Sequence, residues 1–317
     1  MRKWALRIAL VLLALLVAAF AILRTPDTDA AAMRAKYGAE NSMFLNIDRN
    51  VTIHVRDDGP RDGRVIVLLH GSNADLQTWQ PWTEGLEDDY RVVRFDQRGH
   101  GLTGSARDGD YSSDRFVEDI DAVTRALGVD TFVLGGNSMG GGHAVAFALA
   151  HPERLDGLIL VDAGGAPVRG ESKGNIGFTI ARTPGLNRVM EHITPRSMIE
   201  KSLRQSVSNQ SIVTPQAVDR YWELLRYPGN RAATVARFSR GWTTFPAGQV
   251  EGIETPTLIL WGEEDNLIPV EAGRWYASHL PNARIVTYPD IGHLSHEEAA
   301  AATLGDVREW LANAPPR

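Results

Sequence analysis

Cysteine is absent from the 317-residue sequence, and its absence excludes several kinds of site. Without a thiol, the chain can form no disulfide, no thiolate metal site and no cysteine nucleophile. Blocks of lysine or arginine are also missing, and the net charge of −6 predicts no nucleic-acid partner. No pair of histidines has metal-ligand spacing with carboxylates on one predicted helix face, so we expect no metal.

A glycine loop that binds phosphate is missing as well. Gly135 and Gly136 precede Ser138, but the order G-x-G-x-x-G and its spaced acidic partner do not occur there. We therefore expect no cofactor and look for chemistry that side chains perform alone. Hydrophobic residues make up 43% of the chain, enough for the core of one large domain with an insertion.

The N-terminus carries the one long apolar run. Residues 8–23 are apolar, three basic residues precede them and Arg24 follows. This pattern favours an uncleaved signal anchor at residues 1–24, joined to the body by a polar tether at residues 25–40. The basic start predicts a single-pass membrane protein whose catalytic domain is extracytoplasmic. A signal peptide that is cleaved to give a secreted protein, and a buried core helix, remain alternatives.

From residue 41 onward, short apolar runs alternate with segments of helical periodicity. The runs that predict strands are 42–47, 51–55, 65–69, 91–95, 131–134, 155–161, 256–261 and 284–288. The first two predict an antiparallel hairpin. Helical spacing occurs at 113–127, 269–279 and 295–311. The alternation predicts an α/β protein with a doubly wound, mainly parallel sheet, which binds ligands at the carboxyl ends of its strands.

Between residues 164 and 254 this alternation stops, and no buried strand is predicted. Helical spacing occurs instead at 175–189, 195–207 and 214–225, with large aromatic residues at Tyr221, Trp222, Tyr227, Phe238, Trp242 and Phe245. We interpret residues 166–254 as a helical cap inserted between two parts of the core, 41–165 and 255–313. Extra helices on the flank of the sheet are the alternative.

The strongest chemical signal is the sequence Gly136-Asn137-Ser138-Met139-Gly140. It lies between a predicted strand and an alanine-rich predicted helix, which is the context of a nucleophile elbow, G-x-S-x-G. So sharp a turn strains the serine backbone and requires residues without side chains two positions away on either side. It exposes the hydroxyl and directs N–H groups of the helix N-terminus toward developing negative charge. Ser138 is therefore the candidate nucleophile.

A serine hydroxyl needs an imidazole to accept its proton and a carboxylate to orient that imidazole. Asp265 and His293 each follow a predicted strand, and the chain order Ser138, Asp265, His293 is the nucleophile, acid, base order of α/β-hydrolases. A second histidine, His296, follows closely, and we expect it on the surface of the next helix. His143 is expected to be a packing residue.

Taken together, the separated motifs resemble the α/β-hydrolase fold superfamily, in its group of capped esterase-like and carbon–carbon bond hydrolases. The motifs are H-G-S at 70–72, D-x-R-G-x-G at 96–101, G-N-S-M-G-G at 136–141, W-G-x-x-D-x-x-I-P at 261–269 and G-H at 292–293. The resemblance spans residues 42–311.

The resemblance implies roles for further residues. Ser72 and Met139 would supply the backbone N–H groups of an oxyanion hole. Gly71 would let the loop that carries Ser72 approach closely, and His70 would brace that loop. Asp162, directly after a predicted strand, occupies a position from which some family members supply the acid, and it remains the alternative to Asp265. His100, in the R-G-H-G turn, is expected to be structural.

Serine at the elbow argues against epoxide hydrolases and haloalkane dehalogenases of this fold, which use aspartate there. The resemblance implies an acyl-enzyme at Ser138, and a small-molecule carboxylic ester is the expected substrate. G-N-S-M-G-G also resembles hydrolases of ring-fission products, but these usually carry H-G-x-G-P-G and a tryptophan soon after the catalytic histidine. This chain has HGSNAD at 70–75, and Leu294 follows His293. Carbon–carbon hydrolysis, cofactor-free perhydrolase or peroxidase activity, and a membrane-tethered ligand-binding protein without catalysis remain alternatives.

Overall fold

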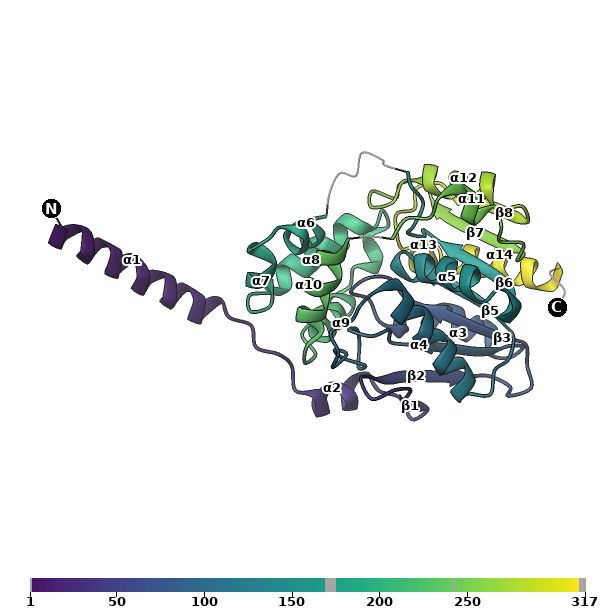
Figure 1. Cartoon of the computed structure of the whole chain (residues 1–317), viewed down its shortest axis with the longest axis horizontal. Coiled ribbons are helices and arrows are strands. Elements are labelled where there is room, and N and C mark those ends of the chain that lie inside the picture. Colours follow the sequence, from purple (N-terminus) through teal and green to yellow (C-terminus); the bar gives the residue numbers. More distant parts are fainter. Residues whose placement is uncertain (1, 169–174, 242, 314–317) are drawn as a thin grey trace.

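The computed structural model describes residues 2–168, 175–241 and 243–313 (Figure 1). Within these ranges eight strands form one sheet in the order β1-β2-β4-β3-β5-β6-β7-β8. Their bounds are β1 Ser42–Asn46, β2 Thr52–Asp58, β3 Val65–Leu69, β4 Arg91–Phe95, β5 Phe132–Asn137, β6 Leu155–Val161, β7 Thr257–Gly262 and β8 Ala283–Tyr288. β2 is antiparallel to β1 and β4, and all other neighbours are parallel. The predicted mainly parallel sheet is confirmed.

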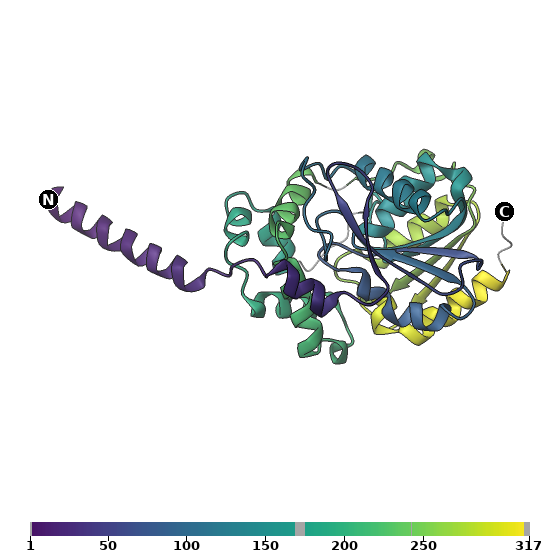
Figure 2. The ribbon, with the colours of Figure 1, turned by 90° about the horizontal axis from the view of Figure 1, so that it is seen from below.

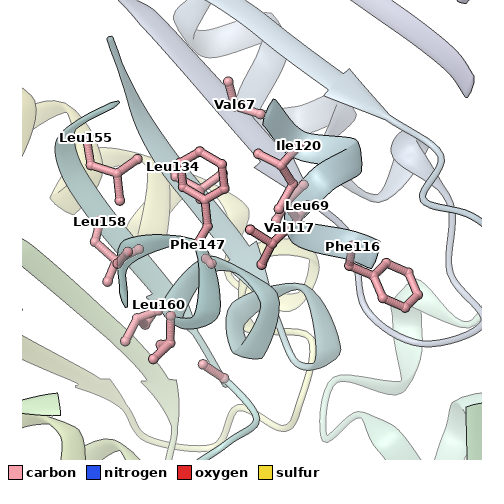
Figure 3. Packing of buried hydrophobic residues seen from close by; sticks show 14 of the residues in the cluster. Val67, Leu69, Phe116, Val117, Ile120, Leu134, Phe147, Leu155, Leu158 and Leu160 are labelled. Carbon is pink, nitrogen blue, oxygen red and sulfur yellow. The ribbon is translucent and has the colours of Figure 1, made fainter. Parts of the chain in front are cut away.

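Helices cover both faces of this sheet (Figures 1 and 2). The core helices are α3 Gln80–Leu86, α4 Ser113–Ala126, α5 Met139–Ala150, α12 Val270–His279, α13 Ser295–Glu298 and α14 Ala300–Asn313, with short 3-10 turns at η1 Leu76–Trp79 and η2 Pro152–Arg154. On β3, Val67 and Leu69 pack in the cluster shared with α4, α5 and α12, part of which Figure 3 shows. Ile66 and Leu68 pack in the opposite cluster, with α3 and α14. Side chains of a strand alternate between faces, so a strand covered on both sides is apolar throughout.

The order of the strands determines where a ligand can bind. From β3 the chain adds β4 on one side, and it then returns to place β5 on the other side of β3. The carboxyl ends of β3 and β5 therefore diverge at a topological switch point, where open α/β sheets leave a crevice. The H-G-S and G-N-S-M-G-G motifs follow these two strands.

Between β6 and β7, the described residues form six helices. They are α6 Ile176–Arg182, α7 Leu186–Met190, α8 Arg196–Ser206, α9 Pro215–Leu225, α10 Asn230–Arg240 and α11 Ala247–Val250, with the 3-10 turn η3 Gln210–Ile212. α6 to α10 form a group at one end of the sheet (Figure 1). The run expected as one helix at 175–189 is two helices, because Pro184 and Gly185, whose φ is +86°, interrupt it. Trp242 lies outside the described residues.

The N-terminal segment has two helices, α1 Arg2–Leu23 and α2 Ala30–Tyr37. α1 projects away from the rest of the molecule in both views (Figures 1 and 2). α2 was not foreseen. Asp29 caps it by accepting a hydrogen bond from the N–H of Ala32 at 2.7 Å. The backbone N–H groups of Thr25 and Thr28 donate to the carbonyls of His192 and Arg226 of the helical insertion. The link between α1 and the sheet therefore lies along that insertion.

Candidate active site

Ser138 occupies the turn between β5 and α5. Its backbone has φ +54° and ψ −118°, a conformation that residues with a side chain rarely adopt. The turn is held on both sides, since the N–H of Ser138 donates to the carbonyl of Val161 at 3.0 Å. Its carbonyl accepts from the N–H groups of Gly142 and Gly164 at 3.1 and 2.8 Å. Strain of this kind persists only where the surrounding structure fixes it, and it concentrates at functional sites.

The two flanking glycines are required by backbone contacts. A Cβ at Gly136 would lie 2.4 Å from the backbone carbon of Gly140. A Cβ at Gly140 would lie 2.4 Å from the carbonyl oxygen of Leu69. Since both obstacles are main-chain atoms, no rotation of a side chain can relieve them.

We expect Gly140→Ala to lower the free energy of unfolding by more than about 2 kcal/mol, because it forces α5 away from β3. Gly305→Ala is the matched control. Gly305 lies inside α14, and a Cβ there would meet nothing within 4 Å. This control should raise the free energy of unfolding by about 0.5–1 kcal/mol, as alanine does in helix interiors. Urea unfolding measures both. Equal effects of the two substitutions would contradict the steric account.

The loop after β3 rests against the elbow. The Nδ1–H of His70 donates to the carbonyl of Gly71 at 2.7 Å, and its Nε2 accepts from the N–H of Gln97 at 3.0 Å. Burial lowers the pKa of His70, so the ring is neutral and braces the loop. A Cβ at Gly71 would lie 2.7 Å from Oδ1 of Asn137, which is why the approach needs glycine.

Ser72 and Met139, the residues predicted to form an oxyanion hole, both lie close to Ser138, since Ser72 shares a cavity wall with Ser138 and Met139 follows it in the chain. Met139 begins α5, so its N–H has no carbonyl partner within the helix. Ser72 lines two cavities. One of them also contains Ser138 and His293 in its wall, and the other contains Met139. Ser72 is therefore the residue that the walls of the two cavities share.

His293 is paired with Asp265. Their Nδ1 and Oδ2 atoms are 2.7 Å apart, and both residues are buried. The other oxygen of Asp265 accepts from the N–H groups of Leu267 and Ile268 at 2.8 and 3.0 Å, which fixes the carboxylate. Burial disfavours the imidazolium, but the charge and hydrogen bond of Asp265, together with the charges of Asp162 and Glu298, raise the pKa of His293 above its usual 6.5.

Asp162 is close to this pair but has other partners. Its Oδ1 accepts from the N–H of Gly262 at 2.9 Å, and its Oδ2 accepts from the hydroxyl of Ser295 at 2.6 Å. Burial, followed by the charge of Asp265, raises its pKa well above the usual value. In the described part of the chain, therefore, the carboxylate that meets His293 is that of Asp265.

The prediction that His296 lies on a helix surface is wrong. The expected helix at 295–311 is interrupted at Ala299, and the short α13 turns His296 inward. Its ring is fully buried at 4.3 Å from that of Trp79, and its Nε2 is 2.9 Å from the hydroxyl of Thr78. Burial lowers its pKa to about 3, so it is a neutral packing residue.

Two other histidines lie beside the site. His143 stacks on Phe116 at a ring distance of 3.9 Å, its Nδ1 is 2.7 Å from Oε1 of Gln97, and burial lowers its pKa to about 3. His100 is buried, with its Nδ1 3.1 Å from the carbonyl of Arg98. Neither lies in the wall of the cavity that contains Ser138 and His293.

Two cavities meet at Ser72. The first, the His293 cavity, has about 750 Å³ of empty space, partly open to solvent, and its wall contains Ser138, His293 and Leu294. The second, the Arg237 cavity, has about 600 Å³, and its wall contains Met139 and Arg237. Among the residues that the structure describes, no group of three histidine or acidic side chains is arranged to hold a metal ion.

A profile of the alpha/beta hydrolase fold matches residues 64–300. The chain belongs to this family. As a hydrolase of this fold it is similar to the 2-hydroxy-6-oxononadienedioate/2-hydroxy-6-oxononatrienedioate hydrolase of Comamonas testosteroni, at 26% identity over 86% of this chain and 96% of that protein. It is also similar to the 2-hydroxymuconate semialdehyde hydrolase of Pseudomonas putida, at 27% identity over 82% and 91%.

Among solved structures, the hydrolase is similar to a thermophilic esterase from Thermogutta terrifontis. The identity is 27%, the TM-score is 0.71, and the match covers 83% of this chain and 94% of the esterase. The α/β-hydrolase prediction is therefore confirmed. The named relatives are all enzymes that act on small molecules, which agrees with the expectation of a small-molecule substrate.

Two residues that support the site of this hydrolase were not singled out from the sequence. Asn137 donates from Nδ2 to the carbonyls of Val161 and His293, both at 3.2 Å, and so ties the elbow to the histidine loop. Its position directly before Ser138 in the sequence could have indicated this role. Glu298 accepts from the N–H groups of Gly292 and Ser208 at 3.0 and 2.8 Å, joining that loop to the insertion. No sequence signal distinguishes Glu298 from a surface helix residue.

Proposed function

We propose that the protein is a serine hydrolase of acyl compounds. In this proposal Ser138 is the nucleophile, His293 the base and then the acid, Asp265 the orienting carboxylate, and Ser72 and Met139 provide the oxyanion hole. The observation that carries it is the 2.7 Å hydrogen bond between His293 and Asp265, at the wall of the cavity that Ser138 enters from a strained turn.

The proposed mechanism uses both nitrogens of His293. Donation from Nδ1–H to Asp265 leaves Nε2 able to accept the proton of the Ser138 hydroxyl. Oγ attacks the carbonyl, and the resulting oxyanion accepts hydrogen bonds from the two backbone N–H groups. Nε2–H then protonates the leaving group, which departs and leaves the acyl-enzyme. A water molecule, deprotonated by Nε2, releases the acid and restores the serine.

This mechanism assigns a side of the site to each half of the substrate. The leaving group receives its proton from His293, so it must lie in the His293 cavity. The acyl half then extends past Met139 into the Arg237 cavity. This assignment of the two halves rests on the presence of His293 in the wall of one cavity and of Met139 in the wall of the other.

The curated relatives favour carbon–carbon bond cleavage over ester hydrolysis. Both named relatives act, by their names, on oxo or semialdehyde acids. Carbon–carbon hydrolysis of such an acid is therefore the second candidate function, with the same acyl-enzyme and a carbon leaving group.

The lining of the His293 cavity favours an ester. Its wall combines uncharged polar side chains with aliphatic ones, among them Met190, Met198, Leu203 and Leu294, and no lysine or arginine occurs among the described residues that line it. An acidic leaving fragment would meet no cation there, whereas an apolar alcohol would be desolvated favourably. The esterase from Thermogutta terrifontis, at 27% identity, supports the same bond type. We therefore propose a carboxylic ester with an apolar alcohol as the primary substrate class.

A substrate panel for the full-length protein in detergent decides between the two bonds. It compares 4-nitrophenyl esters with 2-hydroxy-6-oxohexa-2,4-dienoates. We expect kcat/KM for the best ester to exceed that for the best dienoate by at least about 100-fold. The reverse order would establish carbon–carbon hydrolysis. Turnover of neither, without labelling by a fluorophosphonate, would contradict acyl transfer and favour a ligand-binding protein.

We also propose that α1 anchors the protein in a membrane, with the catalytic domain on the extracytoplasmic side. The segment Leu6–Leu23 has a mean hydropathy of 2.8, and none of it is buried in the protein, although a signal sequence has the same character. Outside α1, the exposed large apolar side chains among the described residues are Leu186 and Val189 of α7. α7 lies where α1 leaves the body, because Thr25 donates to the carbonyl of His192. The apolar surface of α1 and the exposed apolar side chains of α7 could therefore contact the same membrane.

The anchor has a direct test. We expect the expressed protein to stay in the membrane fraction after carbonate washing and to retain its N-terminal residues in intact-mass measurement. A C-terminal alkaline phosphatase fusion should be active, because that reporter requires an extracytoplasmic position. A soluble product that lacks α1 would establish the cleaved signal, and an inactive fusion would reverse the orientation.

A further inference from the structure

Arg237 is a buried cation in the wall of the Arg237 cavity. It lies near the end of α10, and 8% of its surface is exposed. Its Nη1 donates to the carbonyl of Gly99 at 3.2 Å and lies 3.4 Å from Nδ1 of His100. Its Nη2 donates to Oδ1 of Asn73 at 3.0 Å and to Oγ1 of Thr234 at 3.1 Å. Its Nε is buried and has no partner within the described residues.

Among the described residues, no carboxylate matches the charge of Arg237. Two other arginines of α10 do have such a partner, since Arg231 pairs with Asp27 at 2.6 Å and Arg240 with Asp110 at 3.0 Å. No acidic side chain of the described part of the chain forms such a pair with Arg237. Burial lowers its pKa to about 9, as expected for a cation removed from water without an anion.

A structural role alone does not account for this charge. The acceptors of Arg237 are a carbonyl, an amide oxygen and a hydroxyl, which neutral donors could satisfy as well. Burying an unpaired charge is costly, whereas an anionic ligand in the same cavity would offset the cost. A second observation points to a ligand: the hydroxyl of Ser72, in the same wall, is buried and has no partner among the described residues.

We propose that the Arg237 cavity recognises substrates whose acyl half ends in a carboxylate, so that the enzyme prefers monoesters of dicarboxylic acids. Arg237 supplies the cation, and the hydroxyl of Ser72 is an additional donor. This inference rests on the proposed function, because acyl transfer through His293 is what assigns the acyl half to this cavity. The His293 cavity differs in this respect, since the described residues that line it include no lysine or arginine for the alcohol half.

The test compares three esters of similar size at constant ionic strength. They are mono-4-nitrophenyl adipate, 4-nitrophenyl heptanoate, and 4-heptanoyloxybenzoate, which carries its carboxylate on the alcohol side. For the wild type we expect kcat/KM to be at least about 10-fold higher for the adipate than for the heptanoate. Arg237→Gln should lower this ratio at least about 10-fold, whereas Arg237→Lys should retain most of it. Neither substitution should change the ratio of the benzoate to the heptanoate.

Arg231→Gln is the matched control, since Arg231 is a buried arginine of the same helix whose charge is already paired. It should leave the adipate preference unchanged. A wild type without the preference, or an Arg237→Gln variant that loses both esters by the same factor, would overturn the proposal and leave Arg237 a structural residue.

A binding measurement separates this inference from the proposed function. Calorimetry measures the affinity of free adipate for Ser138→Ala and for the double variant Ser138→Ala/Arg237→Gln. We expect at least about 10-fold weaker binding to the double variant. If adipate binding depends on Arg237 but the wild type turns over no ester, the proposed acyl transfer is refuted and the anion site is supported. If the wild type turns over esters but adipate binding does not depend on Arg237, the anion site alone is refuted.

Discussion

Ser138→Ala is expected to abolish covalent labelling by a fluorophosphonate and to lower kcat for 4-nitrophenyl esters by at least about 10⁴-fold. The substitution removes the atom that forms the acyl-enzyme, while the oxyanion donors and both cavities remain. Residual turnover would then come only from bound water and the two backbone N–H groups. Labelling is read by intact mass, and turnover by release of nitrophenolate.

The exposed Ser278 of α12 is the matched control, and Ser278→Ala should keep both labelling and turnover. A third variant, Ser138→Gly, tests the strain. Glycine adopts a φ of +54° readily, so this inactive variant should raise the free energy of unfolding by about 1 kcal/mol. Ester turnover that survives in Ser138→Ala would refute the mechanism. If Ser138→Gly lowers the free energy of unfolding, the claim that the backbone of Ser138 is strained is refuted.

Asp265→Asn is expected to lower kcat by about 10³- to 10⁴-fold, because an amide neither stabilises the imidazolium of His293 nor fixes its tautomer. Asp162→Asn should lower kcat by less than about 10-fold, since Asp162 bonds to Gly262 and Ser295 instead. Asp162→Asn should mainly lower the free energy of unfolding, by about 1–3 kcal/mol, because its amide group would oppose buried donors.

The pH profile tests the same pair independently. Catalysis needs the neutral imidazole, so kcat/KM should be full above the pKa of His293 and fall as the pH drops through it. The charge of Asp265 raises that pKa above 6.5, which places the acid limb of the wild type above 6.5. In Asp265→Asn the charge of Asp265 is gone, so burial lowers the pKa of His293 and the acid limb of kcat/KM should move to lower pH. A stronger loss in Asp162→Asn, or an acid limb that does not move, would transfer the orienting role away from Asp265.

Much of this arrangement could be predicted from local patterns. The central strands of the sheet were recognisable because a strand buried on both faces must be apolar throughout, as Val65–Leu69 is. The elbow was recognisable because backbone contacts at Gly136 and Gly140 forbid any side chain. Helices α2 and α10 were missed; α2 has Met33 as its buried residue and so no continuous apolar face, and tertiary contacts rather than periodicity hold it in place.

Errors arose where a residue's surroundings come from distant parts of the chain. His296 was expected at a surface, but its neighbours Thr78 and Trp79 are more than 200 positions away in the sequence. Glu298 gave no signal, since its partners belong to the histidine loop and to the helical insertion. Burial and pairing are properties of the packed molecule, and no window of sequence contains them.

The sequence by itself determined the class of sheet, the turn that carries Ser138, and the chain order of Ser138, Asp265 and His293 that the proposed mechanism uses, because each depends on local sterics or on chain order. Only the tertiary structure decided that Asp265 rather than Asp162 meets His293, since both carboxylates follow strands and only packing assigns their partners. It also decided that Arg237 is buried, and that no carboxylate of the described residues pairs with it. An arginine in the sequence does not show whether a carboxylate will fold against it.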